Sequence, residues 1–147
     1  MKDQIILHYN MYFNDRIKSL REMIAGLIED AQNDAKGSAG DKHETGLAMM
    51  HLEQEKLNQK LTELLESQKK FSQIDYGASS SQVVPGSLIH TPTDSFLMSV
   101  ALPKIEVGGK TVIGISPQSP LGSLFLQQQA GAEVAFNGFR YTITAVE

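Results

Sequence analysis

The first 76 residues carry apolar side chains at the spacing of two long amphipathic helices. In the first run these positions alternate between steps of four and three residues: Phe13, Ile17, Leu20, Ile24, Leu27 and Ala31. A second run has the same spacing, with glutamines at the two places that would complete it: Met50, Gln54, Leu57, Leu61, Leu64, Gln68 and Phe71. This repeat is typical of a coiled-coil seam, whereas a globular helix has a wider apolar face.

A short segment with two glycines separates the two helical runs. Lys36-Gly37-Ser38-Ala39-Gly40-Asp41 has room only for a reversal of the chain, so we expect an antiparallel coiled-coil hairpin over residues 1–76, with its tip at about 37–45. With about 30 residues in each arm, the arms would be about 45 Å long. No segment adjacent in sequence could cover the far end of so long a hairpin. Its tip should therefore be exposed to solvent.

Beyond residue 76 the chain alternates short β-like runs with turns. All five prolines and eight of the twelve glycines lie in this half. The expected strands cover residues 87–91, 95–101, 111–115, 133–136 and 139–146. Asn137-Gly138, between the last two, is the strongest two-residue hairpin signal, because both central residues of a type I′ turn need a positive φ.

One short helix is expected among these strands. Ser119 supplies an N-cap hydroxyl, Pro120 suits the first helical position, and Gly131 stops the run. The predicted fold class is α+β: a helical hairpin over residues 1–76, a small polar linker over 77–85, and a domain over 86–147 in which one helix packs on a small antiparallel sheet. The expected core residues of this domain are aromatic: Phe96, Phe125, Phe136, Phe139 and Tyr141.

Composition and charge narrow the classes of function. The 147 residues include 13 Lys and Arg, 17 Asp and Glu and no cysteine, which gives a net charge of −4. A protein whose main affinity is for bare nucleic acid needs a basic surface, so this class is disfavoured. The lack of cysteine excludes disulfides, thiolate zinc sites and thiol nucleophiles. No apolar run approaches the roughly 20 residues of a membrane span, and the start of the chain lacks a signal-peptide pattern. We therefore expect a cytoplasmic protein without a membrane partner.

Asp41 and Glu44 are candidate metal ligands at the predicted turn. Two carboxylates three residues apart in the first turn of a helix point to the same side, and hard oxygen ligands suit Mg²⁺. The same spacing is also that of a helix N-cap with its reciprocal partner, worth about 1 kcal/mol together with the helix dipole. Spacing alone favours this structural interpretation. Because two carboxylates cannot complete a Mg²⁺ shell, a catalytic role would need a partner that already holds the metal.

Three segments together carry a resemblance to a known family. The predicted coiled coil ends in Gly40-Asp41-Lys42-His43-Glu44, and the second half contains Val112-Ile113-Gly114-Ile115-Ser116-Pro117-Gln118-Ser119-Pro120-Leu121-Gly122. The last segment is Gly131-Ala132-Glu133-Val134 followed by Asn137-Gly138. From about residue 16 to 146 this pattern resembles the GreA/GreB transcript-cleavage factors of bacterial RNA polymerase. The family has an "ISxxSP" segment at the start of its C-terminal helix and a "GDxV … GG" ending.

The resemblance implies an accessory factor that is not itself an enzyme. The C-terminal domain would have an FKBP-like fold and dock on the rim of the polymerase secondary channel, while the coiled coil reaches the active centre. The contact segment corresponds to Ser116, Gln118, Ser119 and Pro120. Asp41 and Glu44 would help to hold the second Mg²⁺ of the polymerase, which then cuts the extruded 3′ end of a backtracked RNA. The protein would need no cofactor of its own, and its partners would be the polymerase and, indirectly, the nascent RNA.

The chain departs from the family pattern in two places. Gre factors usually follow the second carboxylate with Asn-Ala-Glu-Tyr, but this chain has Thr45-Gly46-Leu47-Ala48, which removes an acid and an aromatic residue near the metal. Gly46 costs up to about 1 kcal/mol relative to alanine in a helix, so close approach to another surface is a candidate reason for it. An acidic residue often precedes the docking Ser-Pro, and here that position is Gln118.

Four lysines of the tip half are candidate contacts for extruded RNA or for weak DNA binding: Lys36, Lys42, Lys56 and Lys60. Scattered lysines on a helix are more often a solvated face, and both interpretations are open.

Three functions remain in competition. The first is stimulation of RNA cleavage. The second is a cleavage-deficient regulator that blocks the active centre or alters initiation, a hypothesis motivated by the altered residues 45–48. The third, a peptidyl-prolyl isomerase with a coiled-coil handle, would show itself in a proline-isomerisation assay.

Overall fold

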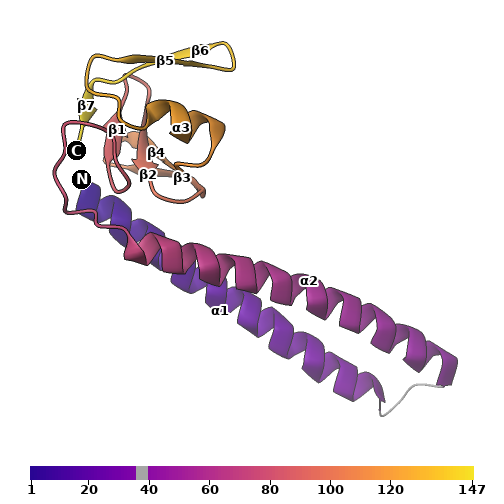
Figure 1. Ribbon diagram of the computed structural model, residues 1–147. Coiled ribbons are helices and arrows are strands. Elements are labelled where there is room, and N and C mark those ends of the chain that lie inside the picture. Colours follow the sequence, from indigo (N-terminus) through magenta and orange to yellow (C-terminus); the bar gives the residue numbers. More distant parts are fainter. Residues whose placement is uncertain (36–39) are drawn as a thin grey trace. The chain divides into compact units, whose positions relative to one another are not determined.

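The computed structural model describes the backbone of residues 1–35 and 40–147, and the side chains of residues 1–33 and 44–147. Two long helices, α1 (Lys2–Ala35) and α2 (Gly40–Gln73), precede strands and one short helix, α3 (Pro120–Phe125) (Figure 1). The predicted α+β class is confirmed. The chain divides into two compact units, one of Met1–Tyr9 with Lys69–Glu147 and the other of Asn10–Gln68. No described helix has the length and hydropathy that a bilayer span requires.

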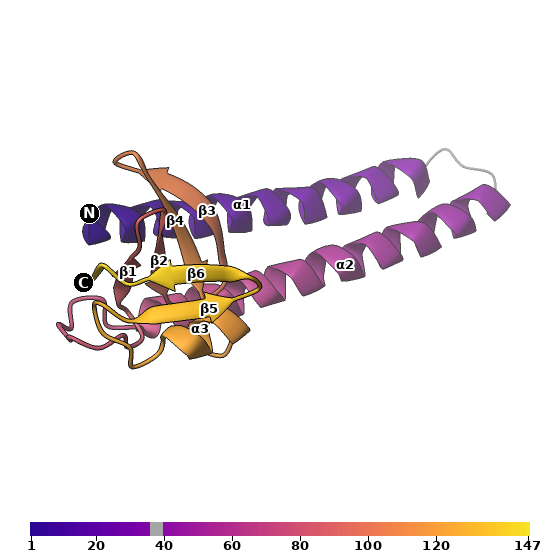
Figure 2. The ribbon, with the colours of Figure 1, turned by 90° about the horizontal axis from the view of Figure 1, so that it is seen from above.

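Within Asn10–Gln68 the two helices run side by side in opposite directions (Figure 2). Gln68 Nε2 donates a hydrogen bond of 3.3 Å to Asn14 Oδ1. Farther along the pair, Leu20 and Leu64 line one groove. As the residue numbers of the paired positions rise along α1, they fall along α2, so the two helices are antiparallel.

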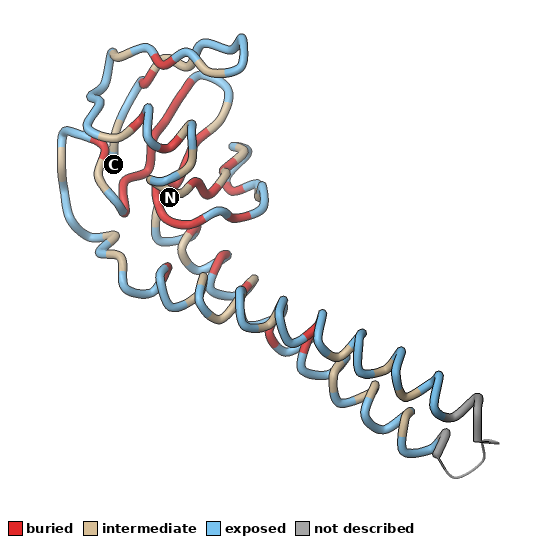
Figure 3. Tube along the Cα trace, turned by 45° about the vertical axis from the view of Figure 1, so that its right-hand side comes forward, coloured by how far each residue is buried: buried red, intermediate tan, exposed pale blue. Residues whose placement is uncertain are grey.

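The seam predicted from the sequence is the contact surface of this helix pair. Each of its apolar positions in residues 10–68 is buried or half-buried. The buried ones are Phe13, Ile17, Leu20 and Leu57. In Figure 3 buried stretches of the chain are red and exposed stretches are pale blue. The positions closer to residue 36, on both helices, are only half-buried: Ile24, Leu27, Ala31 and Met50. Apolar burial therefore stabilises the pair most strongly away from the reversal.

Five strands form a mixed sheet in the order β3-β4-β2-β1-β7: β1 (Leu88–His90), β2 (Asp94–Met98), β3 (Leu102–Val107), β4 (Lys110–Ile115) and β7 (Ala145–Val146). β2 and β4 are parallel, with Phe96 opposite Ile113, and the other pairs are antiparallel. The prediction of a wholly antiparallel sheet is therefore wrong. The parallel pair arises because β3 does not lie between β2 and β4 but at the edge of the sheet, on the far side of β4. The chain passes through β3 and then turns back, so β4 runs beside β2 in the same direction.

β3 was not predicted as a strand because its residues are unusual for one. It carries Pro103, which lacks a backbone N–H, and the charged, exposed Lys104 and Glu106. Proline and charge are features of edge strands, where a missing donor breaks no pairing and exposed charge limits aggregation.

β5 (Glu133–Phe136) and β6 (Phe139–Thr142) form a separate two-stranded sheet. Asn137 and Gly138 between them have φ of 50° and 78°, which confirms the predicted type I′ turn. Phe139 is 65% exposed, so its predicted place in the core is wrong. It adjoins the turn at the end of the ribbon, where little else can cover it.

The core of the sheet unit is built around three aromatic rings. Phe96 lies 5.3 Å from Phe125 and 5.6 Å from Tyr141, measured between ring centroids. α3 supplies Phe125, which is fully buried. The helix ends there and not near Gly131, because Leu126 has a ψ of 135° and Gln127 a positive φ of 64°, neither of which a right-handed helix allows.

Two further segments pack into this unit. The hydroxyl of Tyr9, at the start of α1, donates to the carbonyl oxygens of Pro103 and Val112 at 3.0 and 3.3 Å. Val83, in the predicted linker segment 77–85, is fully buried, and its backbone exchanges hydrogen bonds with residues 127 and 128. The sheet unit therefore includes the first turns of the chain as well as its second half.

Two tyrosines of this unit predict a loss of stability at alkaline pH. Burial raises the pKa of Tyr9 and of Tyr76 above the ordinary value of 10. The unfolded chain ionises above about pH 10 while these hydroxyls stay protonated in the fold. The stability that these raised pKa values contribute is thus fully present below pH 10 and is lost progressively as the pH rises above it. Urea unfolding between pH 9 and 11.5 should show this fall, and Tyr76→Phe should reduce its slope. An unchanged slope would contradict the assignment to Tyr76.

Candidate functional site

The first turn of α2 carries both predicted tip carboxylates. α2 begins at Gly40, so the backbone positions of Asp41 and Glu44 are three residues apart in its first turn. The side chain of Glu44 is exposed, whereas that of Asp41 lies outside the described residues. Glu44 therefore offers a solvent-accessible carboxylate at the start of a 34-residue helix.

Acidic groups outnumber basic ones around the reversal of the chain. Residues 29–55 contain seven Asp and Glu and two Lys, whereas residues 10–28 and 56–73 contain four Asp and Glu and seven Lys and Arg. The acidic side chains of the first range that the structure describes are all exposed: Glu29, Asp30, Glu44, Glu53 and Glu55. A surface of this sign attracts cations and repels bare phosphate.

The four candidate lysines are not brought into one cluster among the described side chains. Lys56 and Lys60 are exposed, and the side chains of Lys36 and Lys42 lie outside the described residues. Lys60 lines a groove together with Arg16 of the other helix. Arg16 was not among the predicted contacts, because it is 44 residues from Lys60 in the sequence and only the seam register brings the two together.

The docking segment is a tight turn held by its own serines. Ser119 Oγ accepts a hydrogen bond from the backbone N–H of Gly122 at 3.0 Å, as predicted for the N-cap, and donates to the carbonyl of Ser116 at 2.6 Å. Ser116 Oγ donates to Gln118 Oε1 at 2.7 Å. Both hydroxyls thus fix the turn, while Gln118 and Pro120 are exposed.

Gly122 is a determinant of this turn that was not predicted from the sequence. A Cβ on Gly122 would lie 1.9 Å from the carbonyl oxygen of Ser116 and 2.8 Å from Ser119 Oγ. The first turn of α3 therefore packs directly on the docking segment, with no space for a side chain. The glycine is visible in the sequence, but the backbone approach that requires it is not.

The described side chains contain no group of three or more His, Asp and Glu that could hold a metal ion. The side chain of Asp41 is not among those described. What the described tip offers is one carboxylate, Glu44, and at most a second from Asp41. Two carboxylates would leave most of a Mg²⁺ shell unfilled.

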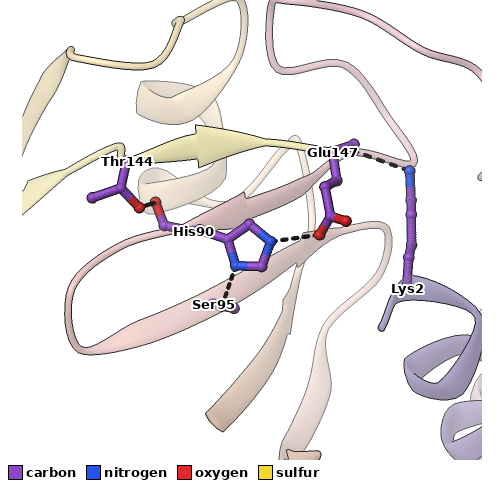
Figure 4. A network of polar contacts seen from close by, with 5 residues as sticks. All are labelled: Lys2, His90, Ser95, Thr144 and Glu147. Carbon is purple, nitrogen blue, oxygen red and sulfur yellow. Dashed lines mark hydrogen bonds and ion pairs between the residues drawn. The ribbon is translucent and has the colours of Figure 1, made fainter. Parts of the chain in front are cut away.

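A polar cluster lies elsewhere, in the sheet unit (Figure 4). His90 Nδ1 is 3.0 Å from Ser95 Oγ, and His90 Nε2 is 2.5 Å from a carboxylate oxygen of Glu147. Lys2 Nζ donates to the backbone carbonyl of Glu147 at 3.1 Å, and burial lowers the pKa of Lys2 although the nearby carboxylates of Glu147 and Asp75 oppose this.

The order of Ser95, His90 and Glu147 resembles a hydrolytic triad, but Ser95 is fully buried. A substrate could not reach its hydroxyl, which a nucleophile requires, and the cluster instead links β1 and β2 to Glu147, the residue after β7. His90 faces Ser95 across the β1–β2 hairpin, a pairing that follows from the register of the two strands.

The predicted site residues fall into two groups on different compact units. Glu44 belongs to Asn10–Gln68, and the docking segment 116–120 belongs to the unit that contains Lys69–Glu147. The serines of the docking segment are joined to their neighbours by hydrogen bonds, whereas the described lysines of the tip half are not clustered. A comparison with models of known protein families finds none that matches this chain, and a search of curated proteins finds no similar one.

Proposed function

We propose that this protein is a Gre-like transcription elongation factor that binds bacterial RNA polymerase through the secondary channel and stimulates Mg-dependent cleavage of backtracked RNA. One observation carries the proposal: Asp41 and Glu44 lie in the first turn of a 34-residue helix, with Glu44 exposed on an acidic part of the hairpin. A helix of this length spans about 50 Å, which suits delivery of carboxylates into a deep cavity.

The chemistry would belong to the polymerase. Two carboxylates leave most of a Mg²⁺ shell unfilled, so the polymerase would hold the metal and the factor would complete its coordination and position water. The protein would then be no enzyme and need no cofactor of its own. It would act in the cytoplasm, and the nascent RNA 3′ end would be a partner only within the polymerase complex.

The second half of the chain would be the docking domain, with an FKBP-like fold. Its contact surface would be the turn of residues 116–120. The internal hydrogen bonds of Ser116 and Ser119 support this, because a preformed turn loses little conformational entropy when a partner binds it. Gln118 and Pro120 are the exposed members of the turn and would make the direct contacts.

A backtracked elongation complex tests the proposal directly. Purified protein added with Mg²⁺ should shorten the RNA from its 3′ end, and a cross-linker at residue 41 should label the polymerase active site. The lack of both effects at saturating protein would remove the proposal. The altered segment 45–48, three of whose four residues are exposed, favours the second candidate, a channel-binding inhibitor. Inhibition of nucleotide addition, with residue 41 cross-linked but the RNA uncut, would identify it.

Gln118→Glu should tighten binding to the polymerase. A carboxylate can accept the same hydrogen bond from Ser116 Oγ, so the turn is kept while an exposed negative charge is added. The resemblance implies an acidic contact at this position, and we expect Kd to fall about three- to tenfold at low salt and less at high salt.

Gln129→Glu, at another exposed position of the same unit, is the matched control and should leave Kd unchanged. Weaker or unchanged binding by Gln118→Glu would contradict the docking role of this turn.

A further inference from the structure

Gly46 is a glycine that the described fold does not require. It lies within α2 and is exposed, and a Cβ built on it would meet no described atom within 4 Å. Its φ is not in the left-handed region, so no turn geometry calls for glycine. A glycine inside a helix destabilises it relative to alanine. Neither packing nor backbone conformation within the described chain offsets that loss.

The position of Gly46 relative to Glu44 suggests what the missing side chain is for. Residues two apart in a helix differ by about 200° around its axis and about 3 Å along it. Gly46 therefore lies on nearly the opposite side of α2 from Glu44. If α2 enters a narrow cavity of a partner, Gly46 would face one wall and Glu44 the opposite wall. The size of the side chain at position 46 would then set how close α2 can come to the first wall, and therefore the distance of the Glu44 carboxylate from the second.

We propose that Gly46 is a positioning residue: without a side chain, α2 lies close against one wall of the partner cavity, and Glu44 on the other side stands at the distance that the metal requires. This rests on the proposed function. A methyl group at position 46 would push the helix by about 1 Å toward the opposite wall, and a displacement of this size can cost about 100-fold in rate. Gly46 touches no reacting atom and acts through the placement of Glu44.

The chain offers a matched control for the change in helix propensity. Gly26, in α1, is the other glycine inside a long helix that has no described atom within 4 Å of its Cβ position. Gly26→Ala adds the same methyl group to the helix that carries neither tip carboxylate. Both alanine variants should raise the urea midpoint of unfolding, because both improve a helix.

The test compares Gly46→Ala, Gly46→Leu and Gly26→Ala with the wild type in RNA cleavage at saturating protein. We expect Gly46→Ala to cut at least tenfold more slowly although it is more stable, Gly46→Leu to be slower still, and Gly26→Ala to stay within twofold. A merely structural role of Gly46 would move stability and cleavage in the same direction. Wild-type rates in Gly46→Ala, or an equal loss in Gly26→Ala, would overturn the inference.

A second measurement separates this inference from the proposed function. Because the chain has no cysteine, Asp41→Cys creates a single attachment point for a cross-linker. Its yield on the polymerase active centre should fall at least threefold when Gly46→Ala is added, even in a complex that does not cleave RNA. If the wild-type protein does not stimulate RNA cleavage but Gly46→Ala still lowers the cross-linking yield, the result would contradict the proposed function and leave the role of Gly46 standing. An unchanged yield would overturn the role of Gly46, and no labelling of the polymerase would remove both proposals.

Discussion

Glu44→Ala should reduce the rate of RNA cleavage at saturating protein by at least 100-fold, which corresponds to about 2.7 kcal/mol of transition-state stabilisation. The substitution removes one of the two ligands that the factor would add to the catalytic Mg²⁺, and with it the placement of the attacking water. Asp41→Ala should have a similar effect. Glu44 is exposed, and the proposed docking segment lies in the other compact unit, so Kd for the polymerase should stay within twofold.

The structural interpretation of the same pair makes a different prediction. If Asp41 and Glu44 only cap α2, Glu44→Ala should lower the free energy of unfolding by up to about 1 kcal/mol and leave cleavage unchanged. Urea unfolding and single-turnover cleavage therefore distinguish the two interpretations. Glu53→Ala is the matched control, because Glu53 is an exposed acid of the same helix but lies beyond its first turn. Equal losses of cleavage in both variants would show that net charge, and not ligand placement, is what matters.

The helical half could be predicted closely because its determinants are local. Alternate steps of four and three residues place Ile17, Leu20 and Leu57 on one stripe of each helix, and all three are buried in the structure. Two long stripes joined by six residues leave the chain no arrangement but a hairpin. The same locality explains the Asn137-Gly138 turn, whose two positive φ angles follow from the residue types.

The sheet could not be predicted as fully, because its order depends on contacts between distant residues. The sequence of either strand alone does not indicate that Phe96 pairs with Ile113 in parallel strands. β3 could not be recognised as a strand because it contains a proline and two charged residues. At the candidate site, too, local features could be predicted from the sequence and contacts made by folding could not. The spacing of Asp41 and Glu44 could be read from the sequence, whereas the approach of Gly122 to the Ser116 carbonyl follows from the folded path of the backbone.

The close approach of Gly122 to the Ser116 carbonyl leads to the largest effect on stability that we expect from a single added methyl group. Gly122→Ala would place a Cβ 1.9 Å from the carbonyl oxygen of Ser116, and a backbone atom cannot swing aside as a side chain can. Either the turn of residues 116–120 or the start of α3 must move, and with it the Ser119 cap and the buried Phe125. We expect a loss of about 2–4 kcal/mol in the free energy of unfolding, measured by urea denaturation.

Gly26→Ala and Gly122→Ala are the same chemical change with opposite expected signs. The first fills open space in a helix and should stabilise the protein by about 1 kcal/mol, while the second forces two backbone segments apart. Under conditions where Gly122→Ala is still folded, the displaced turn should also weaken polymerase binding at least tenfold, whereas Leu124→Ala, at an exposed position of α3, should not. Destabilisation with unchanged binding would mean that the polymerase contacts some surface other than this turn. Unchanged stability would mean that Ser116 and Gly122 are farther apart than the structure places them.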